Sequence, residues 1–574
     1  MTFSIVGRGA AIDRMEREQF DVLVIGGGIT GAGVALDAAS RDLRTALVER
    51  DDFASGTSSK SSKLVHGGIR YLRHREFGLV HEALRERQRL LENAPHLVEP
   101  LPFLFPVIAP AGSSKRASRT LARVAAIGLW LYDAVGGWRI GKLHQKISID
   151  EAIDHMPTLD RDRVTGAFVY LDGRTDDARL TLAILKTAAI ERGATVANYT
   201  CVTGLTRDGE RVSGATVVDT RSGRTFAVQA KVVVNAAGVW SDDVRGLERN
   251  EHPSSIRPAK GVHITVPAAR LPVDIAAILQ LTGDERVVFV VPWGEHVYVG
   301  TTDTDYTGDL DDPVCNRDDV QHLLEVVNAC VRDPITEADV VSTWAGLRPL
   351  INDVQASEKT ADLSRKHRVI SSEGGLVSVT GGKLTTYRQM AADAVDLAVT
   401  EGAGPGGRGR HSRRSRHSRT AKLPIHGAAG LEPLRASGAA ERFGVDPDQF
   451  AHLVGRYGGH ARSVVALLEE DPTFAEPLVP GLPYLRVEAV YAARFEMTVT
   501  LDDLLSRRTR ALILDRAATV TAAPAAAALL AAELGWDAHE QARELEAFLA
   551  IAEHEREAQH TVPSTRGPVD LVGG

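Results

Sequence analysis

The strongest constraint on this chain is a glycine-rich turn between an apolar strand and a helix. Residues 20–25 form an apolar, β-branched run that is typical of a buried parallel strand. Gly26, Gly28 and Gly31 follow in a G-x-G-x-x-G pattern, and the next predicted strand ends at Glu49. Such glycines permit a tight bend and the close approach of a pyrophosphate, while the acid binds a ribose hydroxyl. The pattern predicts a Rossmann-type dinucleotide site, and an acid at position 49 disfavours NADP.

A second loop of small residues follows directly after this unit. Residues 56–72 read GTSSKSSKLVHGGIRYL, in which Lys63, His66 and Arg70 alternate with hydroxyl residues and glycines. A polar surface loop is the simpler interpretation, but it does not require cations at these positions. The segment's small hydroxyl residues and glycines instead suit a loop that wraps a second stretch of a ligand's phosphates. The backbone of such a loop can also lie against a flat ligand ring.

Composition limits the classes of partner. With 574 residues the chain is long enough for several hydrophobic cores. Its net charge of −8 argues against general affinity for nucleic acid. Cys201, Cys315 and Cys330 form neither a C-x-x-C pair nor a zinc-ligand spacing. We therefore expect no metal site, and reduced thiols in a cytosolic setting.

The sequence predicts neither a signal peptide nor a transmembrane helix. Residues 1–19 carry charges and lack an apolar central stretch. The alanine-rich residues 517–532 contain Pro524 and fall short of about twenty strongly apolar residues. Residues 121–141 are interrupted by charges. Membrane association is therefore expected to be peripheral.

Hydrophobic periodicity predicts mixed strands and helices up to about residue 400 and helices from residue 431 onward. Predicted helices and strands include 75–100, 119–134, 177–192, 194–205, 212–219, 225–230 and 232–234. A basic run at 408–422 separates the two parts, and we interpret it as a solvated linker. A patch that binds anionic lipid or an acidic partner is the alternative.

Several sequence blocks in this order resemble the FAD-dependent glycerol-3-phosphate dehydrogenases of aerobic respiration, within the amino-acid-oxidase-like flavoprotein superfamily. The resemblance covers residues from about 20 to about 400, with a weaker match at 496–510. The blocks are GGGITGAG, TSSKSSKLVHGGIRYL, DDARL (176–180), VVNAAGVW (233–240), KGVHITV (260–266), VFVVPW (288–293), GTTDTDY (300–306), WAGLRPL (344–350) and GGKLTTYR (381–388).

The resemblance implies an α/β (α+β) fold with interleaved domains. A Rossmann-like FAD-binding domain at 18–400 is expected to alternate with an antiparallel-sheet substrate domain, roughly 90–160 and 255–345. A basic linker at 401–425 and a helical C-terminal cap domain at 426–560 complete the prediction.

The implied reaction is oxidation of sn-glycerol 3-phosphate to dihydroxyacetone phosphate, with FAD as the hydride acceptor. Arg348 is the strongest candidate for binding phosphate, because a guanidinium can bind it bidentately. Lys383 lies at a glycine turn that opens a helix, where it can face the flavin or the substrate. His66 is our candidate for the base, with His263 as the runner-up.

Further residues are expected around the same two ligands. Expected substrate contacts are Arg70, Tyr71, Lys260, His263, Thr302 and Asp303. Expected cofactor contacts are Gly26, Gly28, Ile29, Thr30, Gly31, Glu49, Arg50, Thr57, Ser58, Ser59, Ser61, Ser62, Lys63, Leu64, His66, Gly67, Gly68, Ala236, Ala237, Gly238, Gly382, Lys383, Leu384 and Thr385.

The sequence contains no iron–sulfur or haem ligand set, so the electrons are expected to leave for a diffusible acceptor. The resemblance implies a membrane quinone and peripheral contact with the inner face of the cell membrane, on the cytoplasmic side; a homodimer is possible. An oxidase that uses O2 shares the same motifs. An FAD-dependent amino-acid or amine oxidase would also contain the nucleotide motif. A non-enzymatic scaffold could bind RNA or lipid through 408–422, but net acidity and the lack of interleaved aromatics there argue against RNA.

Overall fold

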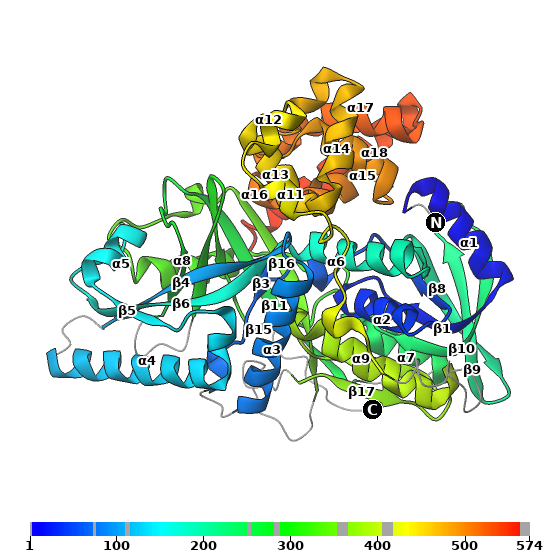
Figure 1. Ribbon diagram of the computed structural model, residues 1–574, viewed down its shortest axis with the longest axis horizontal. Coiled ribbons are helices and arrows are strands. Elements are labelled where there is room, and N and C mark those ends of the chain that lie inside the picture. Colours follow the sequence, from blue (N-terminus) through cyan, green and yellow to red (C-terminus); the bar gives the residue numbers. More distant parts are fainter. Residues whose placement is uncertain are drawn as a thin grey trace.

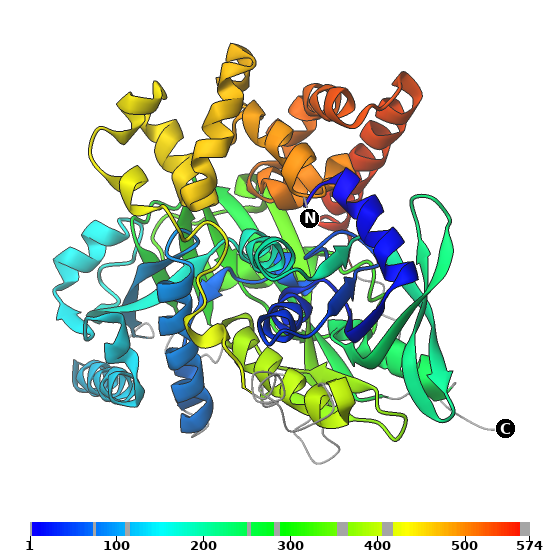
Figure 2. The same ribbon diagram turned by 45° about the vertical axis from the view of Figure 1, so that its right-hand side comes forward.

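Two β-sheets lie side by side, with helices on their outer faces and a helical domain along one side (Figures 1 and 2). The computed structural model describes residues 3–72, 76–109, 115–249, 254–280, 287–352, 366–403 and 417–562, without the side chains of 69–70, 115–119, 121–122 and 249. The helical domain is formed by the C-terminal residues and lies at the top of Figure 1.

The first sheet has the order β17-β18-β10-β1-β2-β7, and its centre is parallel. Helices α1, α2 and α9 pack against its strands, and α6 packs against α2. The bounds are α1 Ile5–Arg17, β1 Gln19–Ile25, α2 Ile29–Ser40, β2 Thr45–Val48, α6 Asp177–Lys186, β7 Thr195–Ala197, β10 Thr225–Asn235, β17 Arg368–Ser371, β18 Val377–Thr380 and α9 Tyr387–Ala398. The apolar run of β1 is buried on both faces, as expected of a central parallel strand.

Strand β10 joins two segments that the sequence predicts as separate strands, 225–230 and 232–234. Its first half pairs with β9 (Arg211–Asp219), which in turn pairs with β8 (Thr200–Asp208), in an antiparallel extension. Its second half pairs with β1. Burial alternates along the first half and is continuous along the second, because only the second half is covered on both faces.

The second sheet is largely antiparallel and has the order β15-β11-β14-β13-β12-β4-β6-β3, with β16 on β11 and β5 on β6. It extends beyond the predicted segments 90–160 and 255–345, because β3, the whole of β6 and the end of β16 also belong to it. The bounds are β3 Leu64–Val65, β4 Val98–Ile108, β5 Gln145–Ile147, β6 Val164–Thr175, β11 Ile256–Pro267, β12 Ala276–Leu279, β13 Val288–Trp293, β14 His296–Gly300, β15 Thr304–Asp305 and β16 Ser342–Ile351.

Helices cover the outer surfaces of the second sheet. Their bounds are α3 Phe77–Asn93, α4 Lys115–Val135, α5 Ile149–His155 and α8 Arg317–Asn328. Helices α5 and α8 contribute to one apolar core of the sheet, and α3 and α4 contribute to another.

The C-terminal domain is helical, as predicted. Its principal helices are α13 Pro447–Tyr457, α14 Ala461–Ala466, α15 Arg486–Phe495, α16 Ala511–Leu514, α17 Arg516–Leu534 and α18 Ala538–Ala558. Among the described residues, α17 alone is long and apolar enough to cross a membrane by length and composition. It packs against α15 and α18 in a shared apolar core, which favours the interpretation as a core helix.

The end of the basic run is attached to helix α2. Residues 404–416 lie outside the described part of the chain. The hydroxyl groups of Ser418 and Thr420 donate hydrogen bonds to the Asp37 carboxylate of α2, and the Arg419 guanidinium donates to the Ser40 carbonyl. The basic side chains of His417, Arg419 and Lys422 are exposed, as predicted for a solvated linker, while Ser418 and Thr420 hold the segment on the surface of α2.

Candidate functional site

A cavity of about 440 Å³ lies between the two sheets. Its walls come from the carboxyl ends of β1, β2 and β10, from strands β11 and β16, and from the loops 55–62 and 381–385. A ligand crevice at the carboxyl ends of parallel strands is expected of doubly wound sheets. We call this space the inter-sheet cavity.

The β1–α2 turn forms one end of the inter-sheet cavity. Gly26 has φ +108°, and a Cβ there would lie 2.7 Å from the Ala236 carbonyl oxygen. A Cβ on Gly31 would lie 1.9 Å from the Gly26 oxygen, so α2 can begin against the strand only with glycine here. The start of α2 therefore presents its N–H groups and positive dipole end to the cavity, which suits a pyrophosphate.

Glu49 lines the inter-sheet cavity at the end of β2. Its carboxylate accepts hydrogen bonds from the amides of Gly27 at 2.5 Å and Asp51 at 3.0 Å. Burial raises the pKa of Glu49 to about 7, although the two amides oppose that shift. A carboxylate held here can accept the hydroxyl groups of a ribose.

Arg50 also lines the cavity, but its charge is engaged by protein groups. It forms ion pairs with Asp51 and Asp311, and its guanidinium lies 4.4 Å from the ring centre of Trp240. Trp240 lines the cavity as well, and its buried Nε1 has no hydrogen-bond partner within the described part of the chain. Such an unsatisfied donor beside a cavity is consistent with a bound polar ligand.

Residues 56–62, which we call the cofactor loop, form the next wall. Thr57, Ser58, Ser61 and Ser62 line the cavity, and the Ser58 hydroxyl accepts the Ile29 N–H at 2.8 Å. This bond ties the loop to the start of α2. The two phosphate-handling segments of the sequence therefore meet in space, as their motifs predict.

Two predicted cofactor contacts, one within the cofactor loop and one directly after it, do not face the cavity. Ser59 is buried and does not line the cavity. The buried Lys63 ammonium lies 3.6 Å from Asp177 and 4.3 Å from the ring centre of Trp344. Burial lowers the pKa of Lys63 to about 7, against the opposing effect of Asp177. Both side chains are buried away from the cavity, so direct contacts with a cofactor are not supported.

Arg348 on β16 lies at the opposite end of the inter-sheet cavity. Its guanidinium donates to Asp303 Oδ1 at 3.1 Å and to Thr301 Oγ1 at 3.0 Å. It also donates to the carbonyls of Thr302 at 3.0 Å and Lys260 at 3.2 Å. The side chain is thus held in one orientation while it remains part of the cavity wall.

His263 on β11 lies beside Arg348 in the cavity wall. Its ring stacks on Trp344 at 4.6 Å, and its Nε2 lies 2.9 Å from the Ser62 hydroxyl. Nδ1 is buried and has no hydrogen-bond partner among the residues described. Burial, followed by the charges of Lys63 and Arg348, lowers the pKa of His263 well below its ordinary value. The imidazole is therefore neutral at pH 7.

Two loops bring His66, Tyr71 and Lys383 to the same cavity. The His66 N–H donates to Thr385 Oγ1 at 3.1 Å, which joins the two loops. The Lys383 ammonium lies 3.7 Å from the ring centre of Tyr71. A Cβ on Gly68 would lie 2.6 Å from the Tyr71 ring, so this glycine allows the contact without lining the cavity itself.

Most of the remaining predicted cofactor residues lie in the cavity wall, and a few do not. Those in the wall are Gly28, Ile29, Thr30, Leu64, Ala236, Ala237, Gly238, Gly382, Leu384 and Thr385. Gly67 is outside it, and its N–H donates to the Tyr132 hydroxyl at 3.1 Å. Gly31 and Gly68 likewise act through packing rather than through contact with the cavity.

The prediction that Lys260 lines the substrate site is wrong. Its buried ammonium lies 2.5 Å from Asp319 of α8 and outside the cavity wall. Gly261 and His263 do line the cavity, and neighbouring side chains of a strand point to opposite faces. Lys260 therefore faces away from the site.

Three other residues that were predicted to contact the substrate are absent from the described cavity wall. Thr302 is buried outside the cavity wall, and its hydroxyl accepts the Val262 N–H at 3.0 Å. Asp303 acts through its ion pair with Arg348. The side chain of Arg70 lies outside the described residues.

Sequence reasoning missed part of the cavity wall. Trp240 stands only two residues after Gly238 in the block VVNAAGVW, so that block could have indicated its place in the cavity wall. Thr200 and Cys201 of β8 also line the cavity, because the Thr200 N–H donates to the Glu49 carbonyl at 2.7 Å. No local pattern in the sequence predicts that contact.

Comparison with known proteins agrees with this geometry. A family model described as FAD dependent oxidoreductase matches residues 21–388. The chain belongs to this family. A second model, the C-terminal domain of alpha-glycerophosphate oxidase, matches residues 418–541. FAD is therefore the cofactor, as the motifs predict, and the mixed fold with a helical C-terminal domain is confirmed.

Three similar proteins carry the same kind of name. Glycerol-3-phosphate dehydrogenase 2 of Mycobacterium tuberculosis is 42% identical over 552 residues, which is 96% of this chain and 90% of that protein. The human mitochondrial glycerol-3-phosphate dehydrogenase is 38% identical, over 92% of this chain and 72% of that protein. The solved structure of the Bacillus halodurans glycerol-3-phosphate dehydrogenase, complexed with FAD, superposes with a TM-score of 0.77 at 31% identity, over 98% and 100% of the two chains.

The residues of the inter-sheet cavity fit FAD. The open helix start at α2 suits its phosphates, Glu49 suits a ribose, and glycines keep the backbone close to the ligand. Lys383 precedes the short helix Leu384–Thr386 and α9. A positive side chain and the positive end of a helix therefore lie together in the wall of the inter-sheet cavity. We assign the cofactor to this cavity.

Proposed function

We propose that this protein oxidises sn-glycerol 3-phosphate to dihydroxyacetone phosphate and passes the electrons to a membrane quinone. The observation that carries the proposal is that Arg348, Lys383, His66 and His263 all line the cavity to which FAD is assigned. The names of the similar proteins support the same substrate. FAD, when bound, supplies the acceptor for the hydride that leaves C2 of the alcohol.

Arg348 is suited to hold the phosphate group of this substrate. Its guanidinium is planar and already fixed by one carboxylate and several neutral oxygens. Asp303 already neutralises the single positive charge of Arg348. A phosphate dianion therefore also needs a further cation, such as Lys383. A guanidinium in a fixed orientation binds phosphate with defined geometry at little further entropic cost.

The two histidines differ in their fitness to accept the hydroxyl proton. Burial, followed by the charges of Lys63 and Arg348, holds the pKa of His263 well below its ordinary value. General bases work best with a pKa near the working pH. We therefore assign the base role to His66 and assign His263 to hydrogen bonding with the substrate.

The anaerobic reaction of the holoenzyme tests this function. We expect glycerol 3-phosphate to bleach the oxidised flavin spectrum, whereas glycerol and amino acids leave it unchanged. Glycerol lacks the phosphate that Arg348 and Lys383 recognise. Bleaching by an amino acid, but not by glycerol 3-phosphate, would replace the proposal with an amino-acid oxidase.

The electron acceptor requires a separate measurement, because the matched C-terminal family model carries the name of an oxidase. Reduction of a soluble quinone analogue is expected to account for substrate consumption. Hydrogen peroxide released in equal amount to the substrate consumed, with no quinone reduced, would assign oxygen instead.

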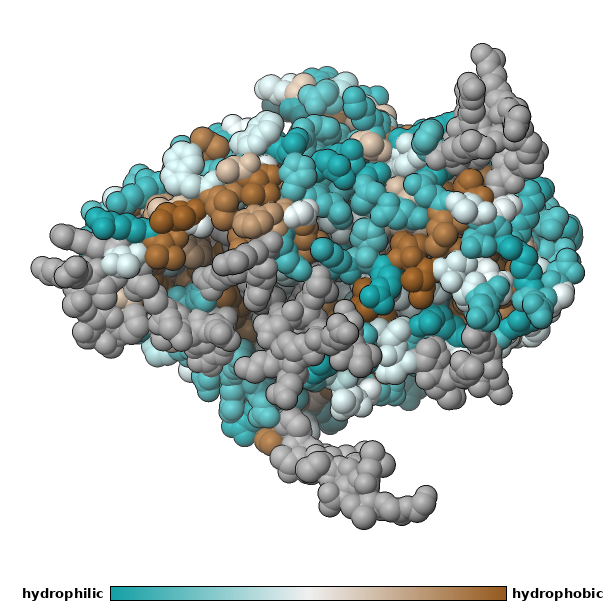
Figure 3. All heavy atoms as spheres, turned by 90° about the horizontal axis from the view of Figure 1, so that it is seen from below, coloured by the Kyte–Doolittle hydropathy of each residue, from teal (hydrophilic) through white to brown (hydrophobic). Residues whose placement is uncertain are grey.

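Helix α4 offers a surface for docking to the membrane from which a quinone would come. Val124, Ile127 and Trp130 are exposed to 63, 67 and 59%. Figure 3 views the side on which α4 lies in Figure 1, and hydrophobic side chains gather there. The exposed Lys142 and Lys146 follow the helix and suit anionic lipid headgroups.

The position of α4 connects this surface to the active site. The helix packs against the segment Ile69–Leu72, and its Tyr132 hydroxyl accepts the Gly67 N–H. Lipid docking would therefore bring the bilayer next to the loop that carries His66 and Tyr71. A quinone could approach the cofactor from this side.

Vesicle sedimentation tests the docking surface. The double variant Ile127→Glu/Trp130→Glu is expected to bind vesicles of phosphatidylglycerol and phosphatidylcholine about tenfold or more weakly, because burial of two large apolar side chains is lost. Ile551→Glu on α18 is the matched control, since Ile551 is also exposed. Equal binding of the double variant and the wild type would exclude α4 as the docking surface.

A further inference from the structure

A row of arginines in the C-terminal domain holds the cofactor loop from outside the cavity. Arg507, Arg508 and Arg510 lie at the end of the π-helix Asp503–Arg508 and just after it. All three are largely buried, and none of them lines the inter-sheet cavity. Their partners include Asp52, just before the cofactor loop, and Ser59, within it.

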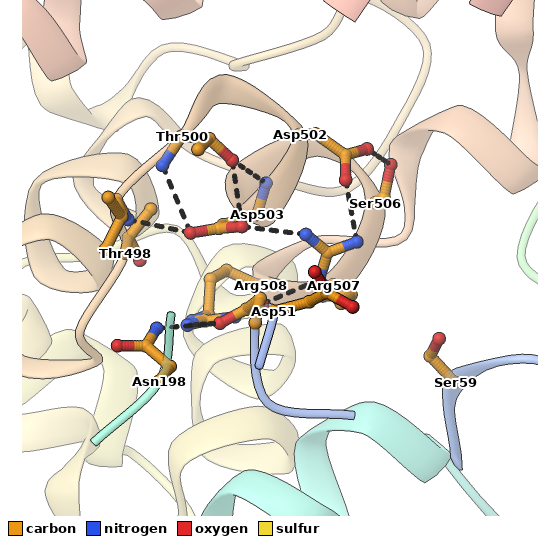
Figure 4. Close-up of polar contacts among 12 residues, drawn as sticks. Asp51, Ser59, Asn198, Thr498, Thr500, Asp502, Asp503, Ser506, Arg507 and Arg508 are labelled. Carbon is orange, nitrogen blue, oxygen red and sulfur yellow. Dashed lines mark hydrogen bonds and ion pairs between the residues drawn. The ribbon is translucent and has the colours of Figure 1, made fainter. Parts of the chain in front are cut away.

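The first anchor lies just before the cofactor loop. Arg508 forms two bonds with the Asp52 carboxylate, at 2.6 and 2.8 Å, and Arg507 forms another at 2.6 Å. Figure 4 shows both arginines pointing from the C-terminal domain toward the chain at Asp51 and Asn198. Burial alone would raise the pKa of Asp52, but Arg508 and Arg507 lower it to about 2. This end of the loop is thus fixed by a charged contact between domains.

The second anchor lies within the cofactor loop. Arg510 donates to the Ser59 carbonyl, and the same nitrogen lies 3.3 Å from Asp177 Oδ1. Asp177 Oδ2 accepts the Ser61 N–H at 3.0 Å and the Ser61 hydroxyl at 2.7 Å. Arg510 and Asp177 are each exposed by no more than 1% at the side chain. They form a rigid, buried base under the part of the loop that faces FAD.

We propose that Arg510 is a positioning residue for FAD binding: from the C-terminal domain it holds the cofactor loop in the shape that receives the cofactor. The physical reason is that Ser58 and Ser61 lie on either side of the carbonyl that Arg510 binds. A shift of that carbonyl moves both cavity-lining hydroxyls. The C-terminal domain is then part of the cofactor site, although it contributes no side chain of this row to the cavity wall.

The test is the affinity of the full-length apoprotein for FAD, measured by titration with flavin fluorescence. Arg510→Gln is expected to weaken FAD binding about tenfold or more, because it removes a buried, charged donor from the Ser59 carbonyl. Arg510→Lys keeps the charge but not the fork-shaped guanidinium, so its affinity for FAD is expected to lie between those of Arg510→Gln and the wild type. The visible circular dichroism of the bound flavin should change in the same order.

Arg494→Gln is the matched control, because Arg494 pairs with Glu533 and Glu470 inside the C-terminal domain. It is expected to lower thermal stability and leave FAD affinity unchanged. FAD binding by Arg510→Gln within about twofold of the wild type would overturn the proposal, and so would an equal loss in Arg494→Gln. If Arg510→Gln does not fold, Arg510→Lys decides: wild-type FAD affinity in that variant rejects the role. These outcomes do not depend on the identity of the substrate.

Discussion

The two ends of the inter-sheet cavity are built in different ways. The nucleotide end comes from neighbouring residues of one strand–helix–strand unit, namely the turn at 26–31 and Glu49. The substrate end is assembled from His66, His263, Arg348 and Lys383, which lie far apart in the chain. The first end depends on local backbone geometry, whereas the second depends on the register of the second sheet. Variants at the two ends should therefore change different quantities.

The largest effect is expected at the substrate end. His66→Ala should lower kcat by roughly 10²–10⁴-fold while FAD remains bound, because a general base is removed. Steady-state kinetics on the FAD-saturated enzyme measures this. His263→Gln is the control variant, since its amide nitrogen can take the place of Nε2 and retain the bond to Ser62, and its kcat should fall by less than about tenfold. A large loss in His263→Gln with little loss in His66→Ala would transfer the base role to His263.

The next effect is expected at the nucleotide end. Gly26→Ala should weaken FAD binding by about 100-fold, because φ +108° is strained for alanine and its Cβ would meet the Ala236 carbonyl. FAD titration of the apoprotein measures this. Gly9→Ala is the control, since a Cβ there has nothing within 4 Å. Unchanged FAD affinity in Gly26→Ala would remove the turn from the cofactor site.

A smaller effect separates substrate binding from cofactor binding. Arg348→Lys should raise KM for glycerol 3-phosphate by about 10–100-fold, since lysine cannot reproduce the fixed guanidinium geometry. The FAD dissociation constant should stay at the wild-type value. Unaltered KM would show that phosphate binds elsewhere, and a parallel loss of FAD would mean that the two ends are not independent.

The smallest effect concerns Glu49 in the apoprotein. Its folded-state pKa of about 7 lies above the ordinary value of 4.5, so the folded state holds a proton that the unfolded state releases. Stability should therefore fall as pH rises from about 4.5 to about 7. Glu49→Gln should flatten this slope when the thermal midpoint is measured across the range. An equally steep slope in the variant would assign it to other groups.

The sequence predicts the nucleotide end well because its chemistry is encoded in consecutive residues. Gly26, Gly28 and Glu49 lie where the motif places them. Strand register is not predictable in the same way. Lys260 belongs to a motif of the substrate site but points to α8, while Thr200 reaches the cavity through pairing beside Glu49.

The C-terminal domain illustrates a second kind of information that local patterns lack. Hydrophobic periodicity predicts its helices, and segment 496–510 belongs to the family resemblance. The contacts of Arg507, Arg508 and Arg510 with Asp52 and Ser59 join residues more than four hundred positions apart. Only the packed structure reveals that this domain supports the cofactor loop.

A crystal structure of the holoenzyme with dihydroxyacetone phosphate most directly tests the central assignment. We predict the flavin ring between the two sheets, with the phosphate within hydrogen-bond distance of Arg348 and Lys383, and the C2 oxygen facing His66. A flavin outside the inter-sheet cavity, or a phosphate bound away from both cations, would show that the proposed site is wrong.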